Sequence, residues 1–285
     1  MSKLLGFLLL TRQAVGKWKK AAAERERKAA SVVCYLKEHR KDHPEDGSRQ
    51  SYYGSGGKEK LGMGVTQFER LVSELGLTIE RRRSWKGTSE RCPRSARYGN
   101  LTNGLVLNGI NQLIVGDLFY FIGELKRYVF VLTDAYSGTI VGLSGGTRMT
   151  AQVALRALDQ FFELRGEGEY PLMIHHTDGG GQYFSDIYLE RLNRAKIRVS
   201  VAGSCQENGY AEQKNNTVKN KYLRHMDTSS DKAFQKSLAA IRLRVNQKRP
   251  MESNEWKTPA DFERMVGLLA IEDRPQKLVH DFREK

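Results

Sequence analysis

The chain has 285 residues but only three cysteines and six prolines, and no low-complexity block. The cysteines, Cys34, Cys92 and Cys205, are too few and too scattered to form a disulfide framework. The low proline content and a hydrophobic fraction of 39% are typical of a globular protein. A chain of this length can hold two or three small domains, with one core of ordinary size.

Long apolar runs are also absent. The leucine-rich residues 4–10 are far fewer than the roughly 20 apolar residues that a membrane span needs. No small-residue cleavage site follows them, and Arg12 and Lys17 come soon after, so they are not predicted to be a signal peptide. We therefore expect a cytosolic protein that does not bind a membrane.

A zinc site would need more ligands than the sequence groups together. Cys34 precedes His39 and His43, which are four residues apart. A tetrahedral structural zinc takes four ligands at tight spacing, and Cys92 stands alone downstream. Zinc is therefore not predicted, and the two histidines are expected on a solvated helix face.

The charge is strongly basic and unevenly distributed. The formal net charge is +14, and residues 1–100 hold 22 Lys and Arg against 11 Asp and Glu. The remaining residues hold 25 against 22, so the rest of the chain is nearly neutral. This pattern predicts a polyanion-binding arm joined to an enzyme core. A generic basic surface and an anionic membrane are alternatives, but no long amphipathic basic helix stands out.

Residues 2–30 are expected to form two helices with a turn. Ser2 can cap the first helix, and Thr11 can cap a basic second helix. This is the outline of a helix-turn-helix whose second helix enters a major groove; an ordinary helical hairpin is the alternative. The candidate DNA contacts of the second helix are Arg12, Lys17, Lys19 and Lys20.

A second helical unit is expected after a polar linker at residues 42–57. Thr66 can cap a helix over residues 67–75, whose apolar residues recur with helical spacing. A basic run follows, suited to track a phosphate backbone without reading sequence. A merely solvated linker is the alternative. The candidate DNA contacts of this run are Arg81, Arg82, Arg83 and Lys86.

The remainder of the chain predicts an α/β core. The expected strands cover residues 112–121, 127–133, 139–143, 171–177 and 197–201. The expected helices cover residues 150–164, 185–195, 207–223 and 230–245. Three strands in a meander followed by alternating helices and strands form an α/β sheet. The expected domains are 1–48, 49–100, a core at 101–262 and a tail at 263–285.

Three acids stand where a site would form. Asp178 ends an apolar strand and precedes three glycines, which allow a large ligand to approach the backbone. Asp117 lies inside another apolar strand, where an unpaired carboxylate is costly to bury and a cation is the simplest partner. Glu212 falls near the start of a helix. A capping aspartate in a plain strand-to-helix turn is the alternative reading of Asp178.

These acids and their neighbours resemble the DDE transposases of bacterial insertion sequences, within the retroviral-integrase superfamily. The matching positions are Asn111-Gln112 before Asp117, His176-Thr177-Asp178-Gly179 with Gln182-Tyr183, Asn208 with Glu212 and Lys219, Asn246, Arg249 and Thr258-Pro259-Ala260. The departures are Glu207 where Asp is usual, Gly209 where Ala is usual, and Val115-Gly116 where an aromatic is common. None of the departures removes a catalytic carboxylate.

The resemblance implies a ribonuclease H-like core, a mixed sheet flanked by helices, preceded by small all-helical helix-turn-helix units. It implies Asp117, Asp178 and Glu212 as catalytic residues and ligands of two Mg²⁺ ions, with Mn²⁺ as a substitute. Two such ions can activate an oxygen nucleophile and stabilise the leaving oxygen of a phosphodiester. Lys219, two helical turns after Glu212, is expected to contact DNA, and His176 and Asn208 to support the site.

The implied activity is cleavage of DNA and transfer of the freed 3′-hydroxyl to target DNA, in the bacterial cytosol or nucleoid. The expected partners are double-stranded DNA, further copies of the chain on that DNA, and the product of an upstream reading frame. Two alternatives stay open: a metal-dependent nuclease of the same fold, and a non-catalytic helix-turn-helix regulator. The intact set of acids argues against the regulator, and the basic front argues against a nuclease of small substrates.

Overall fold

The computed structural model of the chain describes residues 11–80, 92–203 and 209–279. The chain forms two compact units, Met1–Arg82 and Arg83–Lys285, and each is described by itself. We call them the front unit and the core unit. None of the helices in the described ranges is both long enough and apolar enough to cross a membrane.

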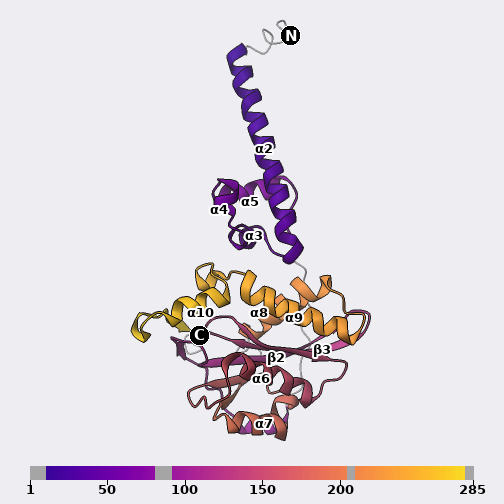
Figure 1. Cartoon of the computed structure of the whole chain (residues 1–285), viewed down its shortest axis with the longest axis vertical. Coiled ribbons are helices and arrows are strands. Elements are labelled where there is room, and N and C mark those ends of the chain that lie inside the picture. Colours follow the sequence, from indigo (N-terminus) through magenta and orange to yellow (C-terminus); the bar gives the residue numbers. More distant parts are fainter. Residues whose placement is uncertain (1–10, 81–91, 204–208, 280–285) are drawn as a thin grey trace. The chain divides into compact units, whose positions relative to one another are not determined.

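Within residues 11–80, the front unit contains four helices around a small core. These are α2 (Arg12–Asp42), α3 (Ser48–Gly54), α4 (Gly57–Leu61) and α5 (Val65–Glu74) (Figure 1). Tyr52 and Phe68 pack together with a ring-centroid separation of 5.5 Å. The buried Tyr35 hydroxyl donates to the Ser51 and Tyr52 carbonyls at 2.8 Å. Side chains of α2, α3 and α5 thus pack in one apolar core, and this core includes residues before and after the predicted domain boundary at residue 48.

The second helix of the expected helix-turn-helix is longer than predicted, and the expected linker is partly helical. Thr11 caps a helix as predicted, its hydroxyl accepting from the Ala14 amide at 3.1 Å, but that helix continues unbroken for 31 residues. The chain has no proline between Thr11 and Asp42, and its alanines favour continued helix. The expected linker at 42–57 instead contains α3, because Tyr52 is buried against α5. The expected first helix lies within residues 1–10, outside the described residues.

The first two-thirds of α2 bury no side chain. Its buried residues are Val32, Tyr35, Leu36 and His39, all toward its C-terminal end. Trp18 is 71% exposed. Ion pairs from Glu24 to Arg27 at 2.7 Å and to Lys28 at 3.6 Å lie along the exposed part and support the helix locally. The continuous basic helix is therefore a feature that the sequence interpretation missed.

The expected solvated face at His39 and His43 is also wrong, because both side chains are buried. Their rings stack with centroids 4.9 Å apart. The His39 ring nitrogens lie 2.7 Å from the Ser55 hydroxyl and 3.3 Å from an Asp46 carboxylate oxygen. These histidines therefore tie the end of α2 to the segments that follow it.

The core unit contains a five-stranded mixed sheet in the order β4-β3-β2-β5-β6. Its strands are β2 (Leu113–Ile122), β3 (Lys126–Asp134), β4 (Ile140–Gly146), β5 (Ile174–Thr177) and β6 (Arg198–Val201). The first three are antiparallel, whereas β5 runs parallel to β2 and to β6. All five lie where alternation and turn residues predict them, with ends shifted by at most three residues.

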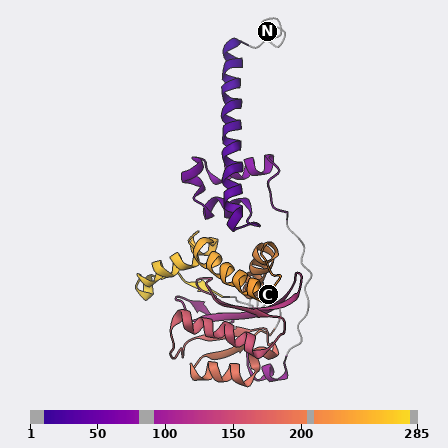
Figure 2. The same cartoon turned by 45° about the vertical axis from the view of Figure 1, so that its right-hand side comes forward.

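Helices cover both faces of this sheet. Figures 1 and 2 show α6 (Ala151–Arg165) and α7 (Asp186–Arg194) on one face. The other face is covered by α8 (Gly209–Asn216), α9 (Asp231–Lys248) and α10 (Pro259–Gly267). Phe161 and Leu192 pack with Phe130 on the first face, and Phe234 and Ile241 pack with Val129 on the second. This arrangement confirms the predicted α/β core.

The C-terminal segment packs on the core unit. Phe262 and Val266 of α10 share an apolar cluster with Leu113. Beyond them, β7 (Lys277–Leu278) pairs antiparallel with β1 (Val106–Leu107) in a separate two-stranded sheet. Sequence alternation cannot find strands of two residues, and their pairing joins segments about 170 residues apart.

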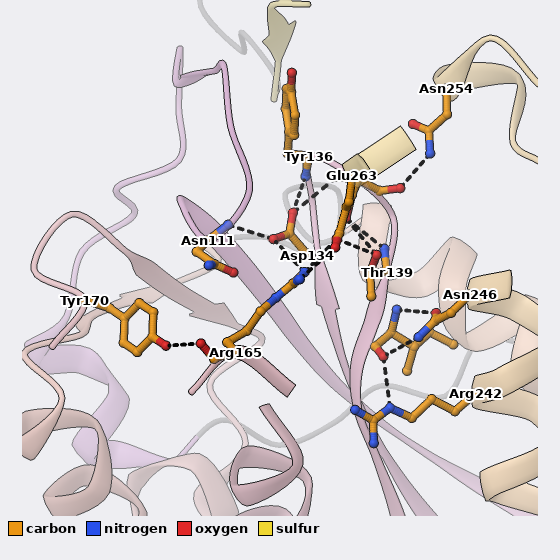
Figure 3. A network of polar contacts seen from close by, with 12 residues as sticks. Asn111, Asp134, Tyr136, Thr139, Arg165, Tyr170, Arg242, Asn246, Asn254 and Glu263 are labelled. Carbon is orange, nitrogen blue, oxygen red and sulfur yellow. Dashed lines mark hydrogen bonds and ion pairs between the residues drawn. The ribbon is translucent and has the colours of Figure 1, made fainter. Parts of the chain in front are cut away.

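A buried polar network joins α10 to the sheet (Figure 3). Arg165 donates to both carboxylate oxygens of Glu263 at 2.7 and 2.6 Å, and lies 3.7 Å from Asp134. Ser137 and Thr139 each donate to Glu263 at 2.6 Å. Burial opposes ionisation of Glu263, but the hydrogen bonds and charge of Arg165 outweigh it and lower its pKa.

Arg165→Met should therefore destabilise the core unit strongly. It leaves two buried carboxylates without their cation, a change that costs about 3–5 kcal/mol in comparable buried pairs. Equilibrium urea unfolding followed by circular dichroism measures the effect. Arg194→Met is the matched control, because it removes an exposed ion pair with Glu190 and should cost less than about 1 kcal/mol. Equal losses in the two variants would contradict the assigned role of the network.

Candidate active site

Two of the three acids lie on neighbouring parallel strands. Gly116 of β2 is paired with Thr177, the last residue of β5, so Asp117 and Asp178 follow at adjacent positions. Asp178 leaves the strand into the glycine turn, and its Oδ1 accepts from the Gly180 amide at 3.0 Å. The strand register itself therefore brings together these two predicted residues.

Glu212 comes from the helix that packs over this part of the sheet. It lies in the first turn of α8. On the same helix, the amide nitrogen Nδ2 of Asn215 donates to Oδ2 of Asp117 at 2.7 Å, and the Leu118 amide donates to Oδ1 at 2.8 Å. Asn215 was not predicted, although its position three residues after Glu212 puts it on the same helix face.

The charges of Asp178 and Glu212 act on Asp117, which is only 8% exposed. Burial is the largest of the causes that raise the pKa of Asp117 to about 7; the two neighbouring carboxylates raise it as well, and the hydrogen bond from the Leu118 amide lowers it. The structure thus places a buried carboxylate next to two like charges.

The donor types fit a hard divalent cation, since Mg²⁺ prefers carboxylate oxygens. Within residues 11–80, 92–203 and 209–279, however, no three His, Cys, Asp or Glu side chains converge closely enough to hold an ion as they stand. Mutual repulsion of the carboxylates is a sufficient reason for this separation. Binding would need the side chains of Asp178 and Glu212 to turn toward Asp117.

The glycine turn after Asp178 packs against the chain segment that contains Cys92 and Ser95. Gly179 has φ +90°, in the left-handed region, and an added Cβ would meet the Ser95 side chain at 3.1 Å. The Cys92 amide donates to the Gly179 carbonyl at 3.0 Å. Ser95 belongs to a 3₁₀ turn, η1 (Pro93–Arg97). The segment before the core, expected only as a basic tether, therefore packs directly on the turn that carries Asp178.

His176 lies on the same strand as the site but is engaged elsewhere. Its ring nitrogen Nδ1 lies 2.9 Å from the Ser200 hydroxyl on β6, and the side chain is buried. It also lines a cavity of about 350 Å³ with Val115 and Tyr210. The neighbouring His175 faces Tyr188, 3.1 Å away, and burial lowers its pKa to about 3. These contacts describe packed histidines.

Lys219 does not follow the spacing that sequence reasoning assumed. The helix after α8 changes to π-helical hydrogen bonding, in η4 (Thr217–Tyr222), so seven residues no longer equal two α-turns. Its ammonium group lies 5.9 Å from the Phe119 ring centroid and 4.9 Å from that of Tyr120. Lys219 therefore lies against β2, the strand of Asp117. The α-helical periodicity of the sequence did not predict this contact.

The other predicted residues divide into two groups. Arg12, Lys17, Lys19 and Lys20 are exposed on α2 of the front unit. Asn208, Arg81, Arg82, Arg83 and Lys86 lie outside the described residues. Two further acids of the core unit, Asp134 and Asp186, have structural partners. Asp134 accepts from the Asn111, Tyr136 and Ser137 amides, and Asp186 pairs with Arg94.

Asp117→Asn should stabilise the metal-free protein in a pH-dependent way. A folded-state pKa of about 7, against an ordinary 3.8, means that the folded protein keeps a proton that the unfolded chain loses. The stability of the wild type therefore falls as pH rises from about 4 to about 7, whereas asparagine stays neutral. Asn215 can turn its amide and keep the hydrogen bond.

Thermal unfolding in a metal chelator measures this difference. The gain from Asp117→Asn should be small near pH 4 and largest near pH 8, on the order of 4 kcal/mol at most. Asp186→Asn, at an exposed acid, should show no such trend. A gain that does not depend on pH, or a loss at pH 8, would contradict the repulsion described above.

Comparisons with known proteins agree with this geometry. Two models described as integrase core domain match residues 108–204 and 193–259, together more than half of the chain. A protein of Mycobacterium tuberculosis named as a transposase of insertion sequence element IS986/IS6110 is 35% identical over 163 residues, 55% of this chain and 59% of that protein. The chain thus spans less than two-thirds of this relative's length.

A second relative is the uncharacterized 31 kDa protein of insertion element IS600 from Shigella sonnei, 29% identical over 73% of this chain and 78% of that protein. Among solved structures, a chain of the simian T-cell lymphotropic virus intasome, in complex with PP2A regulatory subunit B56 gamma, matches with a TM-score of 0.50. That match has 15% identity over 86% of this chain and 77% of the other, and shows the ribonuclease H-like fold alone. The chain therefore belongs to the integrase core domain family over residues 108–259, and it is similar in sequence to transposases of bacterial insertion sequences.

Proposed function

We propose that this chain cuts DNA at the ends of an insertion sequence and joins the freed 3′-hydroxyl to target DNA. The observation that carries the proposal is the buried Asp117, whose pKa is raised by burial and by the charges of Asp178 and Glu212. A carboxylate that is buried beside two further acids can be neutralised by a bound cation. Family membership supplies the reaction class.

The proposed ligands are Asp117, Asp178 and Glu212, with two Mg²⁺ ions and Mn²⁺ as a substitute. When bound, such ions lower the pKa of an attacking oxygen and neutralise charge on the leaving oxygen. Asp117 would lie between the other two acids. Asn215 and the Leu118 amide each donate to one oxygen of Asp117, and the Gly180 amide donates to Oδ1 of Asp178, so these hydrogen bonds orient both carboxylates.

Other residues would bind and orient DNA. Lys219 has its ammonium group beside β2, where it can reach a phosphate held at Asp117. We propose His176 and Asn208 as supports of the site, His176 through its contact with Ser200 on β6. The same supporting role fits η1, which packs on the glycine turn.

The front unit is proposed to grip duplex DNA. Its α2 helix exposes basic side chains over a stretch that buries nothing within the unit. A lone basic helix of this kind can lie in a major groove. The proposed contacts are Arg12, Lys17, Lys19 and Lys20, with Arg81, Arg82, Arg83 and Lys86 following the phosphate backbone.

Transposition also implies partners. Two element ends must be held together, so we propose that several copies of the chain assemble on DNA. The product of an upstream reading frame is a further proposed partner. These complexes would act on DNA of the bacterial cytosol and nucleoid.

Asp117→Asn, Asp178→Asn and Glu212→Gln should each reduce cleavage of a labelled element end by at least about 100-fold, because each removes a proposed metal ligand. Duplex binding in a gel shift should stay nearly unchanged, since the proposed grip lies on other residues. The matched control is Asp186→Asn, which should cleave normally. Circular dichroism establishes that each variant is folded. Retained cleavage in any one variant would remove that residue from the proposed site.

A further inference from the structure

An exposed aromatic ring flanked by lysines lies on β2, close to Asp117. The ammonium groups of Lys219 and Lys126 lie 4.9 and 5.5 Å from the centroid of the Tyr120 ring. We call these three residues the tyrosine–lysine surface. They come from different elements: Tyr120 from β2, Lys126 from the start of β3, and Lys219 from η4.

The surface is open to solvent. Tyr120 is 49% exposed, although the residues on either side of it, Phe119 and Phe121, pack into the cluster beneath α9. Its cross-strand partner is Tyr128, whose ring also lies 5.3 Å from the Lys126 ammonium. Arg224 is near enough to Lys219 to act on its charge. An aromatic ring and a local excess of positive charge are thus presented together.

We propose that the tyrosine–lysine surface binds an unpaired base of the DNA strand that is held at Asp117, with the base stacked on Tyr120 and the lysines on flanking phosphates. This inference rests on the proposed function, since it names how the same site holds its substrate. Base stacking on an aromatic ring is worth more than an exposed cation–π contact. A base can therefore displace the Lys126 and Lys219 side chains from the Tyr120 ring. Their ammonium groups then pair with the phosphates on either side of that base.

The position along the strand sets which base is involved. Tyr120 is three residues after Asp117, roughly 10 Å along the strand at about 3.3 Å per residue, and alternation turns its side chain to the opposite face of β2. The Lys219 ammonium group spans the two faces, since it lies 5.9 Å from the ring centroid of Phe119, on the face of Asp117, and 4.9 Å from that of Tyr120. The pairing of β2 with β5 ends at Gly116, so a DNA strand at Asp117 can pass around this edge of β2 to Tyr120. A DNA strand advances about 3.4 Å per nucleotide in a duplex, so the stacked base lies within about three nucleotides of the phosphate at Asp117. That base must leave the duplex stack to present its face to the ring.

Charge favours nucleic acid over other occupants. A second copy of this basic chain would bring more positive charge to lysines that already flank the ring. Acidic side chains of a partner protein could pair with the lysines but offer no planar face for Tyr120. A nucleotide supplies both the planar face and the negative charge, which is why we commit to it.

The test uses the full chain and a duplex with a single-stranded 3′ tail of about four nucleotides. The probe is 2-aminopurine, a fluorescent base quenched by stacking, placed at each tail position and at the first paired positions. The variants are Tyr120→Ala, Tyr120→Phe and Tyr120→Leu. Ile122→Ala is the matched control, because Ile122 is an exposed apolar residue on the same strand. A chelator is present, so that binding is measured without cleavage.

Wild type and Tyr120→Phe should quench the probe at one or two adjacent positions, and Tyr120→Ala and Tyr120→Leu should lose that quenching. The preference for tailed over blunt duplex should fall about tenfold in Tyr120→Ala, as expected for one stacked base. Ile122→Ala should match wild type. Equal quenching in wild type and Tyr120→Ala, or loss of quenching with Ile122→Ala as well, would overturn the proposal.

Cleavage by the wild type with Mg²⁺ is measured separately, so the two ideas can fail independently. Normal cleavage without Tyr120-dependent quenching would remove this surface and leave the active site standing. Quenching that depends on Tyr120 in a protein that cuts no DNA would leave the base-binding surface and contradict the proposed function.

Discussion

The core unit depends on one electrostatic constraint, the burial of the Asp117 carboxylate beside two other acids. Parallel pairing of β2 and β5 fixes Asp117 and Asp178 at adjacent positions. Glu212 lies in the first turn of α8, the helix that packs on this part of the sheet. Two neutral groups, the Asn215 amide and the Leu118 backbone N–H, donate hydrogen bonds to Asp117. Burial and repulsion therefore raise its pKa to about 7, and this unfavourable arrangement is stable only because the surrounding fold maintains it.

A second buried aspartate shows how the same fold treats a structural acid. Burial raises the pKa of Asp134 to about 6, but three backbone amides donate to it and Arg165 lies 3.7 Å away. The same arginine binds Glu263 and so ties α10 to the sheet. Asp134 thus has an arginine beside it, whereas the charges that act on Asp117 are those of two further acids. This difference separates an acid that holds the fold from one that is available to a ligand.

Much of the core could be predicted because its signals are local. Apolar runs and turn residues located all five strands of the main sheet, and the end of one of them located Asp178. The position of Asp178 beside Asp117 depends on the parallel pairing of β2 with β5. Other features depend on contacts far apart in sequence. The burial of Tyr52 replaced a predicted linker with α3, and the π-helical turns at Thr217–Tyr222 changed the direction of Lys219. Neither the Asp117–Asn215 hydrogen bond nor the pairing of β1 with β7 has a signal in hydrophobic periodicity.

The most direct test of the central claim is a joining assay. The protein is incubated with Mg²⁺ or Mn²⁺, a labelled element end and a supercoiled plasmid, with and without the product of any upstream reading frame. The account predicts covalent joining of the labelled 3′ end to plasmid DNA, because a DNA end held against a target gains a large effective molarity over free water. Nicking without any joined product, at protein concentrations that allow ends to pair and with the partner present, would contradict it and favour a nuclease.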